Sequence, residues 1–419
     1  MQNITDTWSV GESSFDVKLN RHYEGLLAIG SGPLQQRAAL EEGLADDPQN
    51  LEYLRIMGNV TVEKFPDFKS RVGTYLPGVT GRHPTCLDQL INLPTLHSLV
   101  LYAHGERLDM ERCRIRDYSR RLDLRTGRLT RTFVWETRRG AQLRLTFARF
   151  ISAKRRHLMA LRCQVEHLSG PAAELRFVGA LDADVRTNGF DHFESIAVTG
   201  EQEPITVRVR TNGGAEVAAA AVMAADRDII WNADTAARWA GLSGIVTLAP
   251  GTRVTVDKFA ALTSSRHVQS SPLEAARRLV WNAVSDGYAK LAAESDEVWE
   301  RRWAATDVVI DGDPASQLAL RVSLYHILRA VCEGDRRVAI DAKGAAGEAY
   351  CGRFFWDTEL FMLPPLLYTR PEVGKTLAAF RIHSLPGARR NAVRYGYPGA
   401  KYAWESSASG DENCPNWQY

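Results

Sequence analysis

The stretch "HLMALRCQVEHL", residues 157–168, alternates apolar and polar side chains with a period of two. Met159, Leu161, Cys163 and Val165 fall on one side of an extended chain, and the polar residues between them fall on the other. Such alternation is typical of a β-strand with one buried face and one face in water. The stretch therefore predicts that this part of the chain is built from half-buried strands.

The same pattern recurs from about residue 10 to about residue 265. The segments "LRLTF" (143–147) and "ITVRVRT" (205–211) repeat it, and turn sequences such as "RTGR" (125–128) separate the segments. Many antiparallel strands over this length predict a large sandwich of two sheets.

Two features of this region need an interpretation. Arginines on the strands could resemble a nucleic-acid-binding stripe, but a solvated sheet face explains them. The stretch "LQQRAALEEGLADD", residues 34–47, interrupts the strand pattern and predicts a short helical or loop excursion.

After about residue 270 the period changes to three and four, which is typical of helices. The first helical segment opens with a Ser cap and an early Pro, and either Asp313 or Ser316 caps the second. The second segment is apolar on most sides, as is a helix buried among other helices. The predicted segments are 270–305 (one or two helices), 313–334, 357–369 and 370–396.

The composition is that of an ordinary soluble globular protein with 45% hydrophobic and 24% charged residues. A net charge of +2 in 419 residues argues against a nucleic-acid partner, and no apolar run is long enough for a membrane. The six scattered cysteines form no metal-ligand spacing, so we expect reduced thiols in a cytoplasmic protein. No motif for a metal or a nucleotide cofactor is present.

A tryptophan–carboxylate cluster lies within the apolar run "CGRFFWDTELFMLPPLL", residues 351–367. An indole face can cover the C–H face of a sugar ring, and a carboxylate can accept hydrogen bonds from its hydroxyls. Trp356 and Asp357 are therefore candidate sugar ligands, with the alternative that Asp357 caps the helix that follows. For Glu359 we expect a structural ion pair with an arginine such as Arg353.

A second cluster lies in "GYPGAKYAWESSASGDE", residues 396–412. Trp404 and Glu405 repeat the pairing of an indole with a carboxylate and are candidate sugar ligands for the same reason. Asp411 and Glu412 follow closely. We assign them no catalytic role, because a loop position near a helix start is sufficient explanation.

These two blocks closely resemble glycoside hydrolase family 65, which contains phosphorylases of maltose, trehalose, kojibiose and nigerose together with some α-glucoside hydrolases. Further stretches look like landmarks of the family, so that the resemblance covers nearly the whole chain. They are "GTYLPGV" (73–79), "LINLPTL" (90–96), "RLDLRTGRLTR" (121–131), "RTNGFDHF" (186–193) and "GDPASQLALR" (312–321).

The resemblance implies a mainly β and then α protein with three parts. They are an N-terminal β-sandwich (1–268), a helical linker (269–311) and the first part of an (α/α)6 barrel (312–419). It implies that Trp356, Asp357, Trp404 and Glu405 line a glucose subsite. The reaction implied is inverting phosphorolysis of an α-linked glucose disaccharide, with inorganic phosphate as co-substrate and no metal or organic cofactor. Family members are often dimers, which makes a homodimer an expectation.

In this family the general acid and the phosphate-binding residues lie well downstream of the second block. We therefore expect them beyond Tyr419, with no catalytic or phosphate-binding residue in this chain. A twelve-helix barrel needs on the order of 250 residues, so the chain is expected to be truncated, inactive alone, and to expose apolar helix faces. Inverting hydrolysis of α-glucosides and a non-catalytic sugar-binding fragment remain alternatives.

Overall fold

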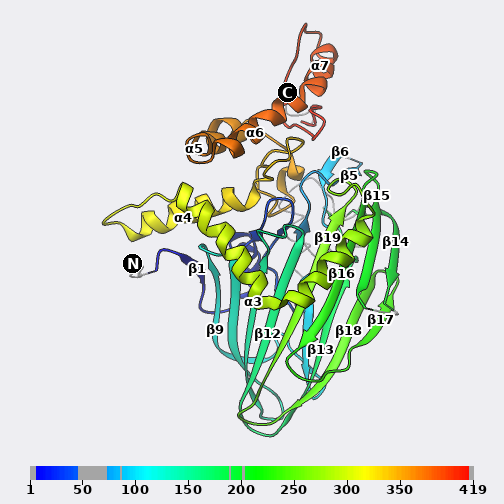
Figure 1. The fold of residues 1–419 in the computed structure, drawn as a ribbon, viewed down its shortest axis with the longest axis vertical. Helices are drawn as coiled ribbons and strands as arrows, with labels where there is room; N and C mark the ends of the chain where they lie inside the picture. Colours follow the sequence, from blue (N-terminus) through cyan, green and yellow to red (C-terminus); the bar gives the residue numbers. More distant parts are fainter. Residues whose placement is uncertain (1–5, 46–72, 85–86, 188–189, 201–202, 415–419) are drawn as a thin grey trace.

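The computed structural model describes residues 6–45, 73–84, 87–187, 190–200 and 203–414. Its larger part is a sandwich of two antiparallel sheets, and helices follow at one end (Figure 1). The nine-stranded sheet consists, in spatial order, of β1 (Ser9–Glu12), β9 (Arg114–Asp123), β10 (Arg128–Glu136), β11 (Gln142–Ile151), β12 (Leu158–Ser169), β19 (Arg253–Ser264), β16 (Glu216–Ala225), β15 (Ile205–Thr211) and β14 (Phe193–Thr199). The five-stranded sheet consists of β17 (Asn232–Ala236), β18 (Trp239–Leu248), β13 (Ala173–Asp182), β7 (Leu99–Ala103) and β8 (Glu106–Arg107).

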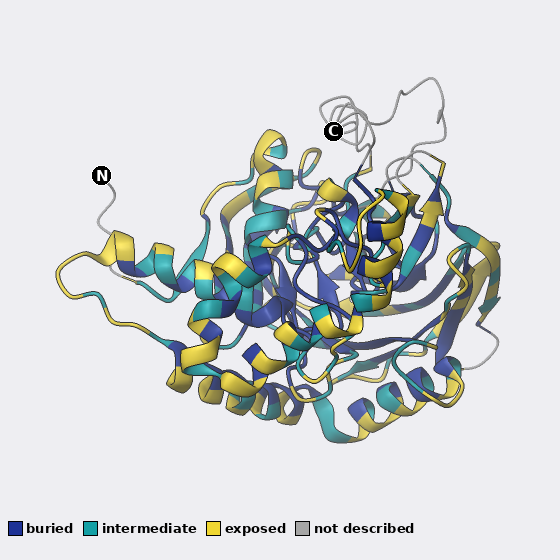
Figure 2. Ribbon diagram, turned by 90° about the horizontal axis from the view of Figure 1, so that it is seen from above, coloured by how far each residue is buried: buried dark blue, intermediate teal, exposed yellow. Residues whose placement is uncertain are grey.

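The predicted sandwich is confirmed, and β12 shows why. Its alternating Met159, Leu161, Cys163 and Val165 are fully buried in the core between the sheets, which they share with residues such as Phe177 of β13. Figure 2 shows the buried residues gathered on the strands inside the molecule. The apolar alternation therefore places one face of each sheet against the other.

The outer face of the nine-stranded sheet is covered by the helix α3 (Pro272–Thr306). Leu158 and Ala160 on this face of β12 pack in one cluster with Val280 and Leu291 of α3. This contact explains why β12 is buried on both faces near its start. Ser271 caps α3, as predicted, and Gly287 breaks it with φ 74° and ψ 162°, so that it consists of two helical segments.

The interpretation of the strand arginines as a solvated face is wrong for Arg120, Arg131 and Arg149. All three are at most 1% exposed, because the loop after β3 folds over this part of the sheet. Arg120 donates to the Ala38 carbonyl of this loop and pairs with Glu12 of β1. Arg131 binds both Glu41 and Glu42, and Arg149 binds Glu41. Burial acts to raise the pKa of Glu41, but Arg149 and Arg131 outweigh it and hold the pKa below its usual range.

The region before β5 contains short elements. A helix, α1 (Val17–Leu26), was not expected from the period-two pattern; Asp16 caps it by accepting a hydrogen bond from the Lys18 N–H. The stretch 34–47 contains β3 and then a loop up to residue 45, which corresponds to the loop alternative and not to a helix. The small strands are β2 (Ile29–Gly30), β3 (Gln35–Gln36) and β4 (Thr74–Tyr75), which pair in one sheet, and β5 (Thr80–His83) and β6 (Leu87–Leu90), which form a hairpin.

A lysine links the two sheets through the core. Lys258 of β19 is fully buried, and its ammonium donates to the carbonyls of Ser98 (2.8 Å) and Ala180 (2.6 Å) on the side of the five-stranded sheet. Burial lowers the pKa of Lys258 to about 7. The two carbonyls replace only part of the hydration that the ammonium loses.

The helices that follow are α4 (Pro314–Ala330), α5 (Leu363–Thr369), α6 (Pro371–His383) and α7 (Leu385–Arg394), with a 3₁₀ turn η2 (Ala349–Gly352) and a π-helical turn η3 (Thr358–Met362). Asp313 caps α4 by accepting from the N–H groups of Ala315 and Ser316, each at 3.1 Å. The segment 370–396, predicted as one helix, is two, since the chain turns at Ser384.

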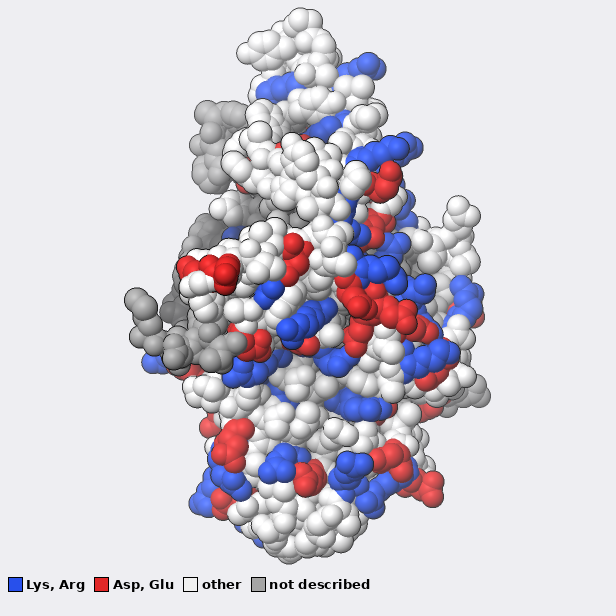
Figure 3. Space-filling view, turned by 60° about the vertical axis from the view of Figure 1, so that its left-hand side comes forward, with Lys and Arg blue, Asp and Glu red and all other residues white. Residues whose placement is uncertain are grey.

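The predicted exposure of apolar helix faces is found on the C-terminal helices. Leu360, Phe361, Leu367 and Tyr368 are between 47% and 90% exposed. Most apolar residues of α4 are half-buried, so it is not surrounded by other helices. On the face drawn in Figure 3, acidic and basic residues are interspersed, and an uncharged area lies on the upper part of the molecule. In the described part of the chain, no helix is both long and apolar enough to cross a membrane.

Candidate functional site

A short antiparallel bridge joins the two predicted clusters. The backbone N–H of Phe354 donates to the carbonyl of Ser406, and the N–H of Ser406 donates to the carbonyl of Phe354, both at 3.0 Å. Trp356 and Asp357 follow Phe354 after one residue, and Trp404 and Glu405 directly precede Ser406. The bridge therefore brings the two tryptophan–carboxylate clusters to one place.

The two tryptophans contact each other edge to face. The ring centroids of Trp356 and Trp404 are 5.7 Å apart at an angle of 76°, and the indole N–H of Trp356 donates to the carbonyl of Ala403 at 2.8 Å. Phe355 packs against Trp404 in the same manner. Trp356 is 43% exposed and Trp404 45%. Fixed indoles with open faces can cover the C–H groups of a bound sugar.

Asp357 lies at an open pocket of about 720 Å³ beside these rings. Among the residues that the structure describes, none donates a hydrogen bond to its half-buried carboxylate, and it does not cap the following turn. The capping alternative is therefore wrong. Eight residues line the pocket: Ala342, Lys343, Tyr350, Phe355, Asp357, Trp404, Glu405 and Cys414.

Glu405 lines the same pocket, but its carboxylate is engaged. Its side chain is buried and forms an ion pair with buried Arg353. The expected pair between Glu359 and Arg353 is therefore not formed. Glu359 instead binds Arg381 through two hydrogen bonds of 2.9 and 2.6 Å, which confirms an arginine partner but corrects its identity. The guanidinium of Arg381 comes from α6, one helix further along the chain.

Glu412 holds the second cluster in place, a role that the sequence did not indicate. Its buried carboxylate accepts from the backbone N–H groups of Trp404 (2.8 Å), Glu405 (3.0 Å) and Cys414 (3.2 Å). Asp411 points elsewhere and binds Arg390 at the surface. The only sequence signal for Glu412 was its position soon after the W-E pair.

Sequence reasoning also missed the pocket residues supplied by the segment between α4 and η3. Lys343 and Tyr350 line the pocket, and the Lys343 ammonium lies 5.4 Å from the centroid of the Tyr350 ring. Both side chains are exposed. The glycine-rich sequence "KGAAGEAY", residues 343–350, was the available signal for a special loop.

The comparison with known families places this architecture. Residues 10–302 match "Glycosyl hydrolase family 65, N-terminal domain", and residues 321–419 match "Glycosyl hydrolase family 65 central catalytic domain". The chain therefore belongs to glycosyl hydrolase family 65.

Curated relatives include phosphorylases of glucose disaccharides. The kojibiose phosphorylase of Caldanaerobacter subterraneus subsp. tengcongensis is 28% identical over 98% of this chain and 53% of its own length. The kojibiose phosphorylase of Escherichia coli K12 is 29% identical, with 98% and 52% covered. The maltose phosphorylase of Bacillus subtilis 168 is 27% identical, with 99% and 54% covered. This chain thus spans about half the length of these relatives.

A solved structure supports the same fold. A protein from the human microbiome with a provisional kojibiose phosphorylase assignment superposes with a TM-score of 0.86 at 21% identity. The superposition covers 99% of this chain and 54% of the other. At this identity the likeness establishes the fold of the sandwich and the helices that follow it.

Proposed function

We propose that this chain provides the glucose-binding wall of an α-glucoside phosphorylase, an enzyme that cleaves an α-linked glucose disaccharide with inorganic phosphate. The observation that carries the proposal is that Asp357, Trp404 and Glu405 line one open pocket, with Trp356 packed against Trp404. None of the residues that the structure describes donates a hydrogen bond to the Asp357 carboxylate. The phosphorylase names of the relatives favour phosphate over water as the attacking group.

The pocket has the groups that a glucose unit requires. The indoles of Trp356 and Trp404 offer apolar surface to the ring C–H groups, and Asp357 can accept hydrogen bonds from two adjacent hydroxyls. Glu405 has one side toward the pocket and the other toward Arg353, so that the ion pair fixes its orientation. A ligand held this way is oriented before any chemistry, which is the main contribution of a positioning subsite.

Inversion at the anomeric carbon needs a general acid for the leaving oxygen and phosphate on the opposite face. Each carboxylate near the pocket other than Asp357 is already engaged: Glu405 with Arg353, Glu359 with Arg381, Glu412 with backbone N–H groups. We therefore propose that the general acid and the phosphate-binding residues come from a part of the protein beyond these 419 residues, and that this chain alone has no turnover.

The C-terminal helices fit the same proposal. Apolar side chains such as Phe361 and Tyr368 project into solvent, as expected of helices that pack against further helices of an (α/α)6 barrel. A homodimer and a cytoplasmic location remain predictions.

The proposal is tested by incubating the purified chain with kojibiose, maltose, trehalose or nigerose, with and without phosphate, and by titrating it with glucose. We expect saturable glucose binding and no release of glucose 1-phosphate or glucose from the disaccharides. Phosphate-dependent glucose 1-phosphate release would contradict the proposed lack of turnover. Absence of glucose binding would contradict the proposed subsite.

A further inference from the structure

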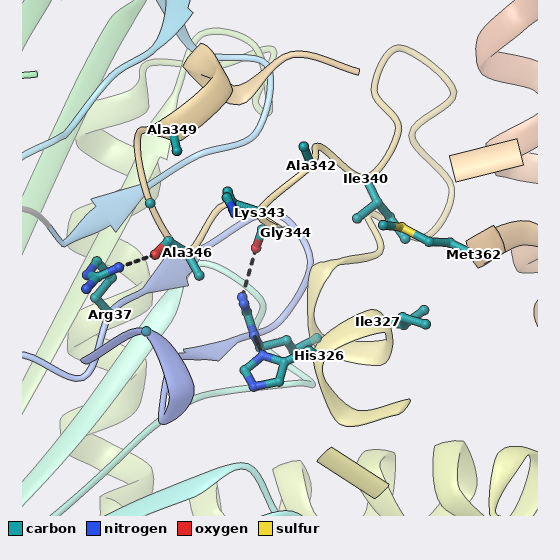
Figure 4. Close-up of a pocket in the computed structure, with 13 residues that line it drawn as sticks. Arg37, His326, Ile327, Ile340, Ala342, Lys343, Gly344, Ala346, Ala349 and Met362 are labelled. Carbon is teal, nitrogen blue, oxygen red and sulfur yellow. Dashed lines mark hydrogen bonds between the residues drawn. The ribbon is translucent and has the colours of Figure 1, made fainter. Parts of the chain in front are cut away.

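The loop of residues 341–352, here the pocket loop, lies between two cavities. On one side it contributes Ala342, Lys343 and Tyr350 to the candidate glucose pocket. On the other side is a cavity of about 590 Å³, lined by backbone of the same loop around Gly344 and Gly347 and by residues of α1, of the chain after β3 and of α4 (Figure 4). Where the loop presents Lys343 and Tyr350 to open space it has little packing, whereas Ala345, Glu348 and Cys351 are buried.

The backbone conformation of the pocket loop also costs conformational energy at three non-glycine residues. Ala345, Tyr350 and Cys351 have positive φ angles of 49°, 58° and 56°, a region that side chains with a Cβ rarely adopt. Each such residue costs on the order of 1 kcal/mol. The loop therefore keeps this shape only if contacts from outside it compensate.

Arg37, which directly follows β3 of the small three-stranded sheet, makes one of these contacts. Its guanidinium donates to the carbonyl of Ala346 at 2.5 Å and to the carbonyl of Arg21 at 2.7 Å, and it lies 3.6 Å from the carboxylate of Glu24. Its side chain is only 13% exposed. Figure 4 shows Arg37 reaching across the cavity to Ala346. One arginine thus connects α1 with the middle of the pocket loop.

A second arginine, from helix α4, also donates hydrogen bonds to the pocket loop. Arg329 of α4 donates to the carbonyl of Gly344 at 2.9 Å, and also to the side chain of Gln35, two residues before Arg37 in the sequence. The two carbonyls that accept from these arginines, those of Gly344 and Ala346, are two residues apart in the loop. The stretch that directly follows Lys343 is therefore held by β3 and α4 together.

The hairpin of β5 and β6 supports the end of the loop. Leu90 forms a buried cluster with Tyr75 and Ala345, and a Cβ at Gly352 would lie 2.2 Å from the Cβ of Leu90. This approach is so close that only glycine fits. The small β2–β4 sheet and the β5–β6 hairpin thus contact the pocket loop at its middle and at its end.

We infer that the small β elements beside the sandwich, the β2–β4 sheet and the β5–β6 hairpin, set the shape of the glucose pocket, with Arg37 as a positioning residue that acts through the pocket loop. The inference rests on the proposed glucose subsite. Arg37 does not line the pocket beside Trp404 and Asp357; it holds the backbone that presents Lys343 and Tyr350 there.

The test compares the wild-type chain with Arg37→Met, which keeps the aliphatic stem but removes every donor. Two readouts are used: the glucose dissociation constant from tryptophan fluorescence, and the rate of trypsin cleavage after Lys343, identified by mass spectrometry of the fragments. Arg162→Met is the matched control, because Arg162 loses two hydrogen bonds of 2.7 Å to Asp257 in the sandwich but does not touch the loop.

We expect trypsin to cleave Arg37→Met after Lys343 at least tenfold faster than the wild type, and the variant to bind glucose at least tenfold more weakly. Arg162→Met should match the wild type in cleavage rate and in glucose affinity. If Arg37→Met shows no cooperative thermal transition and is therefore unfolded, Arg37→Lys is measured in its place with the same two readouts. Lysine keeps a positive charge opposite Glu24 but cannot donate to the carbonyls of Ala346 and Arg21 together. Faster cleavage with unchanged glucose binding, or unchanged cleavage, would overturn the inference. A wild-type chain that does not bind glucose would instead refute the proposed subsite.

Discussion

Replacing Lys258 by Met probes the buried ammonium that links the two sheets. The lysine donates to two carbonyls, and no carboxylate in the described part of the chain pairs with it. Met has a similar length and leaves the core filled. The variant removes the buried charge and its two hydrogen bonds, and changes little else.

The size of the expected change in the free energy of unfolding follows from the pKa of Lys258, which burial lowers from 10.5 to about 7. In the unfolded chain the lysine keeps its proton up to about pH 10.5, whereas in the folded chain it loses the proton above about pH 7. The unfolded state therefore binds more protons between these values, and the free energy of unfolding rises with pH by up to about 1.4 kcal/mol per pH unit. Between pH 7 and pH 9 this amounts to about 2 kcal/mol.

The assay is urea unfolding at pH 7 and pH 9, followed by far-UV circular dichroism. Groups other than Lys258 titrate equally in both proteins, so that the difference between wild type and Lys258→Met isolates this residue. We expect the wild type to gain about 2 kcal/mol over the variant from pH 7 to pH 9, and exposed Lys18→Met to behave as the wild type. An equal difference at both pH values would refute the reasoning.

Three further predictions concern other parts of the molecule. Glu412→Gln places an amide N–H₂ against backbone donors, so we expect about tenfold weaker glucose binding in a titration of Trp404 fluorescence; unchanged affinity would exclude the anchoring role. Arg131→Met removes the arginine partner of buried Glu42, while Glu41 keeps Arg149, and is expected to lower the free energy of unfolding by about 3–5 kcal/mol in urea, whereas a loss below about 1 kcal/mol would mean that the network is unimportant. Phe361→Ser combined with Tyr368→Ser is expected to reduce self-association in sedimentation velocity; identical association would show that these rings do not drive it.

The sandwich and the helical segments could be predicted because periodicity is a local property. The alternation in 157–168 specifies a strand whatever its neighbours are, and the sheet places it as expected. The failures concern partners that are distant in sequence. Arg131 alternates in phase with buried Leu129 and Phe133, but its charge suggested a solvated position, and only the fold brings Glu41 and Glu42 to it.

At the candidate site, too, local sequence features could be predicted, whereas partners distant in sequence could not. The chemistry of indoles and carboxylates, with the family resemblance, selected four residues: three of them line one pocket and Trp356 packs against Trp404 beside it, although their role in binding glucose remains a prediction. It could not select Arg381 over Arg353 as the partner of Glu359, because that choice depends on how α6 packs. Lys343 and Tyr350 were missed because their loop carries no periodicity and is shaped by contacts from the small β elements beside the sandwich.

The central claim is that Asp357 binds glucose hydroxyls, and the most direct measurement is a glucose titration of wild type and Asp357→Asn by tryptophan fluorescence. Loss of charge-assisted hydrogen bonds is worth about 1.5–3 kcal/mol, so the account predicts at least about tenfold weaker binding for Asp357→Asn. Asp411→Asn, at a surface carboxylate paired with Arg390, should match the wild type. Equal glucose affinity in wild type and Asp357→Asn would contradict the account.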